Sequence, residues 1–241
     1  MTGIIPARWA STRFPGKPLH LLAGKPLIQH VWERCREAKR LTRIVVATDD
    51  DRIAVVAKNF GAEVFPTRTD HPSGTDRIAE VARQLPENEP VINIQGDEPL
   101  VDPALIDCIA EALTSEDPPE MVTAASVITD PSALVNPNIV KAVLNRAGDA
   151  LYFSRSRIPF PRNTAANAPA YHHIGIYGYQ RAFLLQFVEW PQGVLEQAEQ
   201  LEQLRALENG ARIRVLITAQ AARGVDTPAD VAFVEAHLAG R

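Results

Sequence analysis

Over residues 1–128 the chain alternates short runs of apolar and β-branched residues with amphipathic segments whose apolar residues recur at helical spacing. The strand-like runs are GII, RIVVAT, AEVFP, PVINIQ and MVTAASVI. Such alternation is typical of a largely parallel sheet covered by helices on both faces. We therefore expect an α/β protein with a mostly parallel sheet.

The pattern changes after residue 128. Two strand-like segments, IVKAVLN and ALYFS, are joined by the turn-like RAGD, and AYHHIGIYGY predicts a further strand. The segment VLEQAEQLEQLRALENG predicts one helix that stops at Gly210. The strand-like RIRVLIT and a final helix after Pro228 then return the chain to the first pattern. We expect a single domain over residues 1–241, with a smaller antiparallel lobe inserted at about 129–192.

Composition and charge narrow the class of ligand. No apolar run reaches the ~20 residues of a membrane span, and no signal-peptide pattern is visible, so we expect a cytoplasmic protein without membrane association. Residues 1–43 carry nine basic and two acidic side chains, a local charge of +7, whereas the whole chain carries −4. Because the pI is near 5.9 and no basic stripe alternates with aromatics, a small anion is favoured over nucleic acid.

A basic loop follows the first predicted strand. The stretch IIPARWASTRFPGKPL contains Arg8, Arg13 and Lys17 between prolines and a glycine. It is not a P-loop, because Pro18 stands where that motif requires Ser or Thr. A solvated basic loop is the alternative. Since ligands of open α/β sheets bind at the carboxyl ends of strands, we favour a phosphate-binding loop.

Two carboxylates follow predicted strands without being needed as helix caps. Asp97 ends INIQGD, and the next helix has its own N-cap in Asp102. In GVDTPAD, Thr227 and Asp230 form a capping box, which leaves Asp226 outside it. Carboxylates in such positions suit a divalent cation bound with phosphates, although a cap role for Asp226 is the alternative.

A fourth motif, HPSGTDRIAE, places Ser73 and Gly74 before a predicted helix, with Arg77 in its first turn. Such a loop offers backbone N–H and hydroxyl groups to a base or a phosphate. An ordinary helix N-cap is the alternative.

Together these motifs resemble the 3-deoxy-D-manno-octulosonate (Kdo) cytidylyltransferase family through almost the whole chain. The motifs that carry the resemblance are PARWASTRFPGKPL, VATDDDRI, HPSGTDRIAE, NIQGDEPL, NPNIVKAV, ALYFSRSRIPF, HHIGIYGY, LEQLRAL and GVDTPADV. The resemblance implies a Rossmann-like nucleotide-diphospho-sugar transferase fold and a cytoplasmic homodimer. It also implies a reaction in which CTP and Kdo give CMP-Kdo and pyrophosphate with Mg²⁺, for lipopolysaccharide biosynthesis.

The resemblance also assigns roles to residues. The catalytic set would be Arg8, Lys17, Asp97 and Asp226, of which Asp97 and Asp226 bind the metal. CTP would contact Arg8, Arg13, Lys17, Ser73, Gly74 and Gln95. The acid sugar would contact Arg155, His173, Tyr177, Glu202 and Gln203. By themselves, Glu202 and Gln203 also fit a solvated helix face, and Tyr177 fits a packing aromatic. The chain departs from the family pattern at Trp9, where Tyr is common, and in a shortened segment before Asp226.

These roles predict in-line attack of the sugar's anomeric hydroxyl on the α-phosphorus of CTP, helped by positioning and by charge stabilisation rather than by a nucleophilic side chain. Two other functions stay open. One is a cytidylyltransferase for another acid sugar, of the sialic acid type or an amino-modified Kdo. The other is a non-catalytic nucleotide-sugar binding protein.

Overall fold

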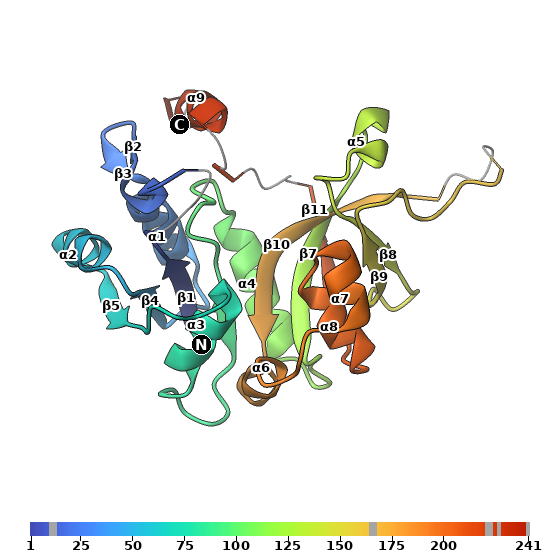
Figure 1. Ribbon diagram of the computed structural model, residues 1–241, viewed down its shortest axis with the longest axis horizontal. Helices are drawn as coiled ribbons and strands as arrows, with labels where there is room; N and C mark the ends of the chain where they lie inside the picture. Colours follow the sequence, from blue (N-terminus) through green and yellow to red (C-terminus); the bar gives the residue numbers. More distant parts are fainter. Residues whose placement is uncertain (10–13, 164–167, 220–223, 226–227, 240–241) are drawn as a thin grey trace. The chain divides into compact units, whose positions relative to one another are not determined.

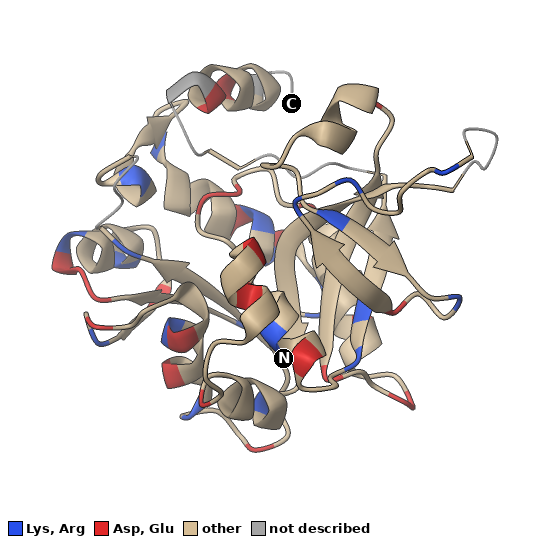
Figure 2. Ribbon diagram, turned by 45° about the vertical axis from the view of Figure 1, so that its right-hand side comes forward, with Lys and Arg blue, Asp and Glu red and all other residues tan. Residues whose placement is uncertain are grey.

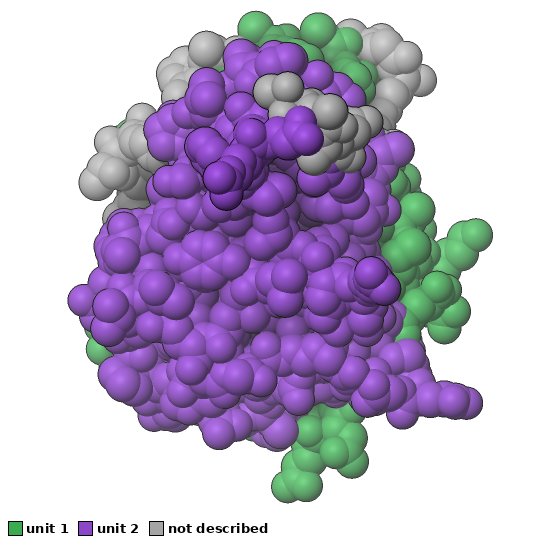
Figure 3. Space-filling view, turned by 90° about the vertical axis from the view of Figure 1, so that its right-hand side faces the viewer, with its two compact units in different colours: residues 1–111, 222–241 green, residues 112–221 purple. Residues whose placement is uncertain are grey.

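The computed structural model describes residues 1–9, 14–163, 168–219, 224–225 and 228–239 (Figure 1). The chain forms two compact units, Met1–Glu111 with Ala222–Arg241, and Ala112–Ala221, coloured green and purple in Figure 3. The segment expected as an inserted lobe lies inside the second unit. In the described part of the chain, no helix is long and apolar enough to cross a membrane.

The first unit contains a parallel sheet (Figure 1). Its strands lie in the order β6 (Val91–Asn93), β1 (Thr2–Ala7), β4 (Arg43–Thr48) and β5 (Glu63–Pro66). The helices that begin in this unit are η1 (Lys17–Leu19, a 3-10 turn), α1 (Leu27–Glu37), α2 (Asp51–Asn59), α3 (Gly74–Ala82), α4 (Pro103–Leu113) and α9 (Pro228–Ala239). A short hairpin joins β2 (Leu21–Leu22) to β3 (Lys25–Pro26). The predicted parallel strand–helix alternation is confirmed.

The sequence explains these elements locally. β1 is buried almost throughout, with Ile4 and Ile5 fully buried, as expected of a central parallel strand. The predicted cap of α4 is confirmed, since Asp102 Oδ1 accepts the N–H of Ala104 at 3.0 Å. Charged residues lie mainly on helices and loops rather than on strands (Figure 2).

The second unit contains a mixed sheet. Its strands are β7 (Met121–Val127), β8 (Lys141–Leu144), β9 (Ala150–Ser154), β10 (Tyr171–Tyr179) and β11 (Ile213–Thr218). β7 pairs in parallel with β11 and antiparallel with β10, and β8 pairs antiparallel with both β9 and β10. The helices are α5 (Pro131–Val135), α6 (Arg181–Phe187), α7 (Val194–Glu199) and α8 (Gln203–Glu208). The predicted antiparallel strands are therefore confirmed.

One predicted helix is wrong. The glutamate-rich segment forms two helices, α7 and α8, because Gln200 has a left-handed conformation with φ of 53°. The carbonyls of Glu199 and Gln200 accept hydrogen bonds from Arg155 at 2.7 and 3.2 Å. These contacts come from the residue that directly follows β9, more than 40 positions earlier in the chain, so they override a continuous helical pattern. Gly210 follows the end of α8 with φ of 77°, as predicted.

Candidate active site

A cavity of about 410 Å³ opens at the carboxyl ends of β1 and β6 in the first unit. Six of the predicted nucleotide and catalytic residues line it: Arg8, Lys17, Ser73, Gly74, Gln95 and Asp97. Its other lining residues are Pro6, Ala7, Pro18, His71, Pro72, Arg77 and Gly96. Arg13 and Asp226, the remaining predictions for this site, lie outside the described residues.

Lys17 and Asp97 form an ion pair in this cavity. Lys17 Nζ lies 2.5 Å from Asp97 Oδ2, and the two side chains are 14% and 34% exposed. Lys17 begins η1 directly after Gly16, and Asp97 lies beyond β6. The predicted phosphate-binding cation and the predicted metal carboxylate are therefore in direct contact.

The turn that carries Asp97 depends on a close backbone approach. A Cβ atom at Gly96 would lie 2.8 Å from the carbonyl oxygen of Pro6, so a larger residue would push the turn away from β1. The carbonyl of Asp97 accepts the N–H of Val225 at 2.9 Å. Val225 is the residue before Asp226 in the sequence. The backbone of the residue that precedes the second predicted carboxylate is therefore hydrogen-bonded to the residue that carries the first.

The start of α3 forms one wall of the cavity. The hydroxyl of Ser73 accepts the N–H groups of Thr75 and Asp76 at 3.1 Å each, and donates to Asp76 Oδ2 at 2.6 Å. The N-cap interpretation of Ser73 is thus confirmed, and the residue lines the cavity as well. A cap fixes the direction of the helix N-terminus, whose partial positive charge favours anions.

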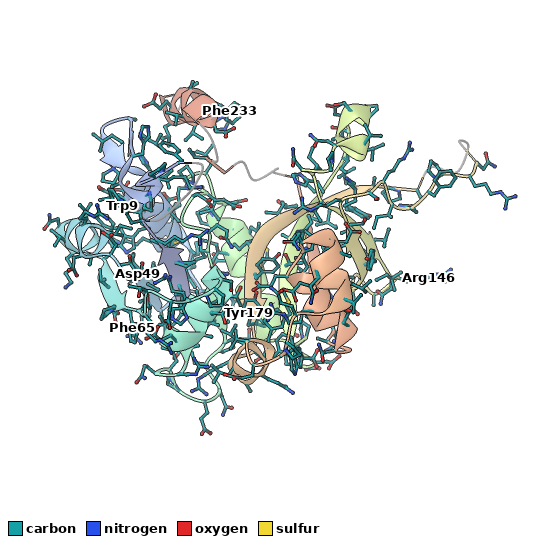
Figure 4. The ribbon with its side chains drawn as sticks, viewed as in Figure 1. Trp9, Asp49, Phe65, Arg146, Tyr179 and Phe233 are labelled. Atoms are coloured by element: carbon teal, nitrogen blue, oxygen red, sulfur yellow. The ribbon has the colours of Figure 1, made fainter. Side chains whose placement is uncertain are left out.

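Two lining residues were not proposed as site residues from the sequence. Arg77 is only 4% exposed, and it pairs with Asp49 Oδ2 at 3.2 Å and donates to Thr67 Oγ1. His71 Nε2 lies 2.5 Å from a carboxylate oxygen of Glu80. Both flank the predicted Ser-Gly motif, which is the signal that could have found them. Asp49 is labelled in Figure 4.

The second unit holds a cluster of three residues predicted for the acid sugar. His173 Nε2 lies 3.0 Å from Thr123 Oγ1, and burial lowers the pKa of His173 to about 3. The Tyr177 hydroxyl donates to Gln203 Oε1 at 3.4 Å, and the Tyr177 and His173 ring centroids are 5.5 Å apart. Gln203 is 3% exposed, so the solvated-face alternative is wrong for it. Its buried Nε2 has no hydrogen-bond partner among the described residues.

The other two predicted sugar residues are engaged in local structure. Arg155 donates to the carbonyls of Glu199, Pro137 and Gln200 at 2.7, 3.0 and 3.2 Å. Glu202 lies 3.7 Å from Arg205, at the start of α8. Arg155 therefore anchors the end of α7, which directly precedes α8, the helix that begins with Gln203.

A buried ion pair joins α7 to α8. Arg205 Nε and Nη2 donate to the two carboxylate oxygens of Glu196 at 2.7 and 2.6 Å, and both residues are at least 93% buried, with 7% and 5% exposed. The fork geometry fixes both groups. This ion pair therefore holds α8, the helix that carries Gln203, against α7.

Comparisons with known proteins give matches over most of the chain. The sequence model described as cytidylyltransferase matches residues 2–213. The chain is 54% identical to a 3-deoxy-manno-octulosonate cytidylyltransferase of Solibacter usitatus, over 95% of this chain and 90% of the relative. It is 49% identical to an 8-amino-3,8-dideoxy-manno-octulosonate cytidylyltransferase of Shewanella piezotolerans, over 99% and 98%.

A solved structure has the same fold. A CMP:2-keto-3-deoxy-manno-octonic acid synthetase in complex with CTP superposes with a TM-score of 0.94 at 42% identity, covering 99% of this chain and 98% of the other. The predicted α/β nucleotidyltransferase fold is thereby confirmed.

Proposed function

We infer, because this chain belongs to the cytidylyltransferase family, that it transfers the cytidylyl group of CTP to Kdo and releases pyrophosphate. The observation that carries this proposal is the cavity at the ends of parallel strands that Arg8, Lys17 and Asp97 line, with Lys17 in contact with Asp97. Cations there suit a triphosphate, and the carboxylate suits a metal that accompanies it. The product CMP-Kdo would supply lipopolysaccharide biosynthesis.

In this proposal the first unit binds CTP. Arg8, Arg13 and Lys17 hold the phosphates, because guanidinium forks and a compact ammonium match phosphate oxygens. The N-terminus of α3, with Ser73 and Gly74, and the side chain of Gln95 would contact the cytidine. These groups bind and orient the nucleotide, so that the α-phosphorus faces the attacking hydroxyl.

The proposed metal is Mg²⁺, held by Asp97 and Asp226. The described residues contain no group of three or more His, Cys, Asp and Glu side chains able to hold a metal. Mg²⁺ usually takes only one or two protein carboxylates, with waters and phosphates as its other ligands, so the donor set fits. When bound, the ion neutralises charge that builds on the phosphoryl oxygens.

The second unit is proposed to bind the acid sugar through Arg155, His173, Tyr177, Glu202 and Gln203. Since its pKa is lowered to about 3, His173 would be neutral at physiological pH and would act by hydrogen bonding rather than by proton transfer. The unpartnered amide N–H₂ of Gln203 supports a polar ligand here, because a buried donor without a partner is costly.

We also propose that the protein acts as a cytoplasmic homodimer. Exposed apolar side chains of the second unit support this assembly, since Phe160 is 82% exposed, Val135 70% and Leu151 61%. Light scattering at micromolar concentration should give twice the monomer mass, and Phe160→Asp should lower it. A wild-type monomer would contradict the proposal.

Pyrophosphate release tests the reaction. The protein is given Mg²⁺, each of the four nucleoside triphosphates, and Kdo, its 8-amino analogue or a sialic acid. We expect release with CTP and Kdo, and at least a hundredfold slower turnover for Asp97→Asn, in line with lost transition-state stabilisation of about 3 kcal/mol. Pyrophosphate release with the 8-amino sugar alone would show that this sugar, not Kdo, is the substrate. No release with any pair of nucleotide and sugar would favour a non-catalytic nucleotide-sugar binding protein.

A further inference from the structure

A stack of two side chains joins the ends of β1 and β4 beside the cavity. Ala7 and Thr48 are partners in the parallel register of these strands, and Trp9 and Asp50 each follow two residues later. The guanidinium carbon of Arg52 lies 3.4 Å from the centroid of the Trp9 ring. This is close cation–π contact, well within the ~6 Å at which such pairs attract. Trp9 is labelled in Figure 4.

The same ring contacts the backbone of the basic loop. A Cβ atom at Gly16 would lie 2.9 Å from Cη2 of Trp9, and Gly16 has φ of 70°. The N–H of Gly16 donates to the carbonyl of Trp9 at 3.2 Å. A glycine is therefore required here both by the left-handed backbone and by the ring, and the ring fixes the residue that directly precedes Lys17.

Arg52 is itself held in place by Asp50. Nε and Nη2 of Arg52 donate to the two carboxylate oxygens of Asp50 at 3.0 and 2.6 Å. The same carboxylate caps α2 by accepting the N–H of Arg52 at 3.0 Å. Hydrogen bonds from Arg52 lower the pKa of the Asp50 carboxyl, which keeps it ionised. The plane of the guanidinium is thus set before it stacks on Trp9.

We propose that Trp9 and Arg52 are positioning residues of the phosphate-binding loop. They hold the backbone of Gly16, from which Lys17 projects to Asp97, so the cation is placed before the nucleotide arrives. The inference rests on the proposed function, because the ligand in question is the triphosphate of CTP. Without the stack the loop keeps all its phosphate-binding charges but must be ordered on binding, which weakens affinity.

Arg52→Gln tests the stack, with Arg43→Gln as the matched control. Arg43 forms an equivalent fork with Glu63, at 3.0 and 2.5 Å, at the opposite end of β4. We expect Arg52→Gln to raise the Kd of CTP and its KM by about two- to fivefold, the size of an exposed cation–π contact. The KM of the acid sugar and the melting temperature should stay unchanged. Arg43→Gln should leave the Kd of CTP unchanged.

Arg52→Lys separates stacking from charge. Its ammonium keeps the charge and can still face the indole, but it loses the planar fork that Asp50 holds, so we expect it to recover at most part of the CTP affinity lost in Arg52→Gln. Three results would overturn the proposal: wild-type CTP affinity in Arg52→Gln, wild-type affinity in Arg52→Lys, or an equal loss in Arg43→Gln.

Fluorescence gives a readout that does not depend on CTP. The emission of Trp9 is obtained as the difference between proteins with Trp9 and with Trp9→Phe. Its quenching by acrylamide should increase in Arg52→Gln, because one face of the indole is uncovered. If the wild type fails to bind CTP, the proposed function is wrong, and unchanged quenching in Arg52→Gln would then also overturn the positioning role.

Discussion

Replacing Lys17 by Met should strengthen the binding of a divalent metal in the absence of nucleotide, although it should weaken turnover. Lys17 Nζ lies 2.5 Å from Asp97 Oδ2, so an ammonium occupies the carboxylate that we propose as a metal ligand. A metal and the ammonium must then compete for Asp97. Met keeps an unbranched apolar stem of nearly the same length and removes the ammonium group.

The expected gain in metal affinity follows from the exposure of the Lys17–Asp97 pair. At a separation of 2.5 Å, two unit charges interact by about 7 kcal/mol at an effective dielectric of ~20, and by about 2 kcal/mol in water. The side chains of Lys17 and Asp97 are 14% and 34% exposed, so the pair lies between these limits. Hydrogen bonds to charged groups contribute about 1.5–3 kcal/mol net. We use the lower value because Asp97 is partly solvated, and expect about tenfold tighter metal binding.

Mn²⁺ binding without nucleotide can be followed by electron paramagnetic resonance. The matched control is Lys25→Met, which breaks an ion pair with Glu33 at 2.7 Å in the same unit, where the side chains are 48% and 35% exposed. Lys25→Met removes the same charge from the surface but leaves the cavity intact. If Lys17→Met binds Mn²⁺ no more tightly than Lys25→Met does, Lys17 does not compete for Asp97 and the reasoning fails.

Three further predictions concern stability. Gly16→Ala should lower the free energy of unfolding by about 1–2 kcal/mol in urea titrations, because its φ is 70° and a Cβ would meet the Trp9 ring; no change would contradict the strain. Glu196→Gln should lower the free energy of unfolding by about 1–3 kcal/mol, because it replaces the buried carboxylate that binds two nitrogens of Arg205 with a neutral amide and leaves the more distant carboxylate of Glu202, at 3.7 Å, beside Arg205; a loss below about 0.5 kcal/mol would indicate a solvated pair. The lowered pKa of His173, about 3, means that the unfolded chain takes up the proton first as pH falls below ~6.5. Stability should then fall by up to about 1.4 kcal/mol per pH unit between pH 6.5 and 3, and His173→Gln should reduce that slope.

The parallel core was predictable because each of its signals is local. Strands buried on both faces appear in the sequence as continuous apolar runs, and N-cap residues such as Asp102 mark where the next helix begins. The break at Gln200 was not predictable. It depends on Arg155, a residue 45 positions away, whose guanidinium needs the carbonyls that a continuous helix would have used.

The cavity proposed as the nucleotide site was predictable to the extent that strand ends meet at one edge of a sheet. That rule brought together Lys17 and Asp97, which are 80 positions apart. It did not find Arg77, because an arginine in the first turn of a helix has the same local pattern whether it is solvated or buried. Its burial depends on Asp49, which follows a neighbouring strand, and on Thr67 beyond the next one.

Arg155 has two roles, one implied by the resemblance and one shown by its hydrogen bonds, and its number of N–H donors allows both. The resemblance gives it a role with the acid sugar, whereas the structure uses its guanidinium to hold the carbonyls of Pro137, Glu199 and Gln200. A guanidinium has five N–H donors, and one bond from each of its three nitrogens uses three of them. The same group can therefore fix the break between α7 and α8 and still offer donors to a carboxylate. Gln203 is the first residue of α8 and is also predicted to contact the sugar. By fixing the break before α8, Arg155 therefore helps to set the position of Gln203, its partner in the proposed sugar site.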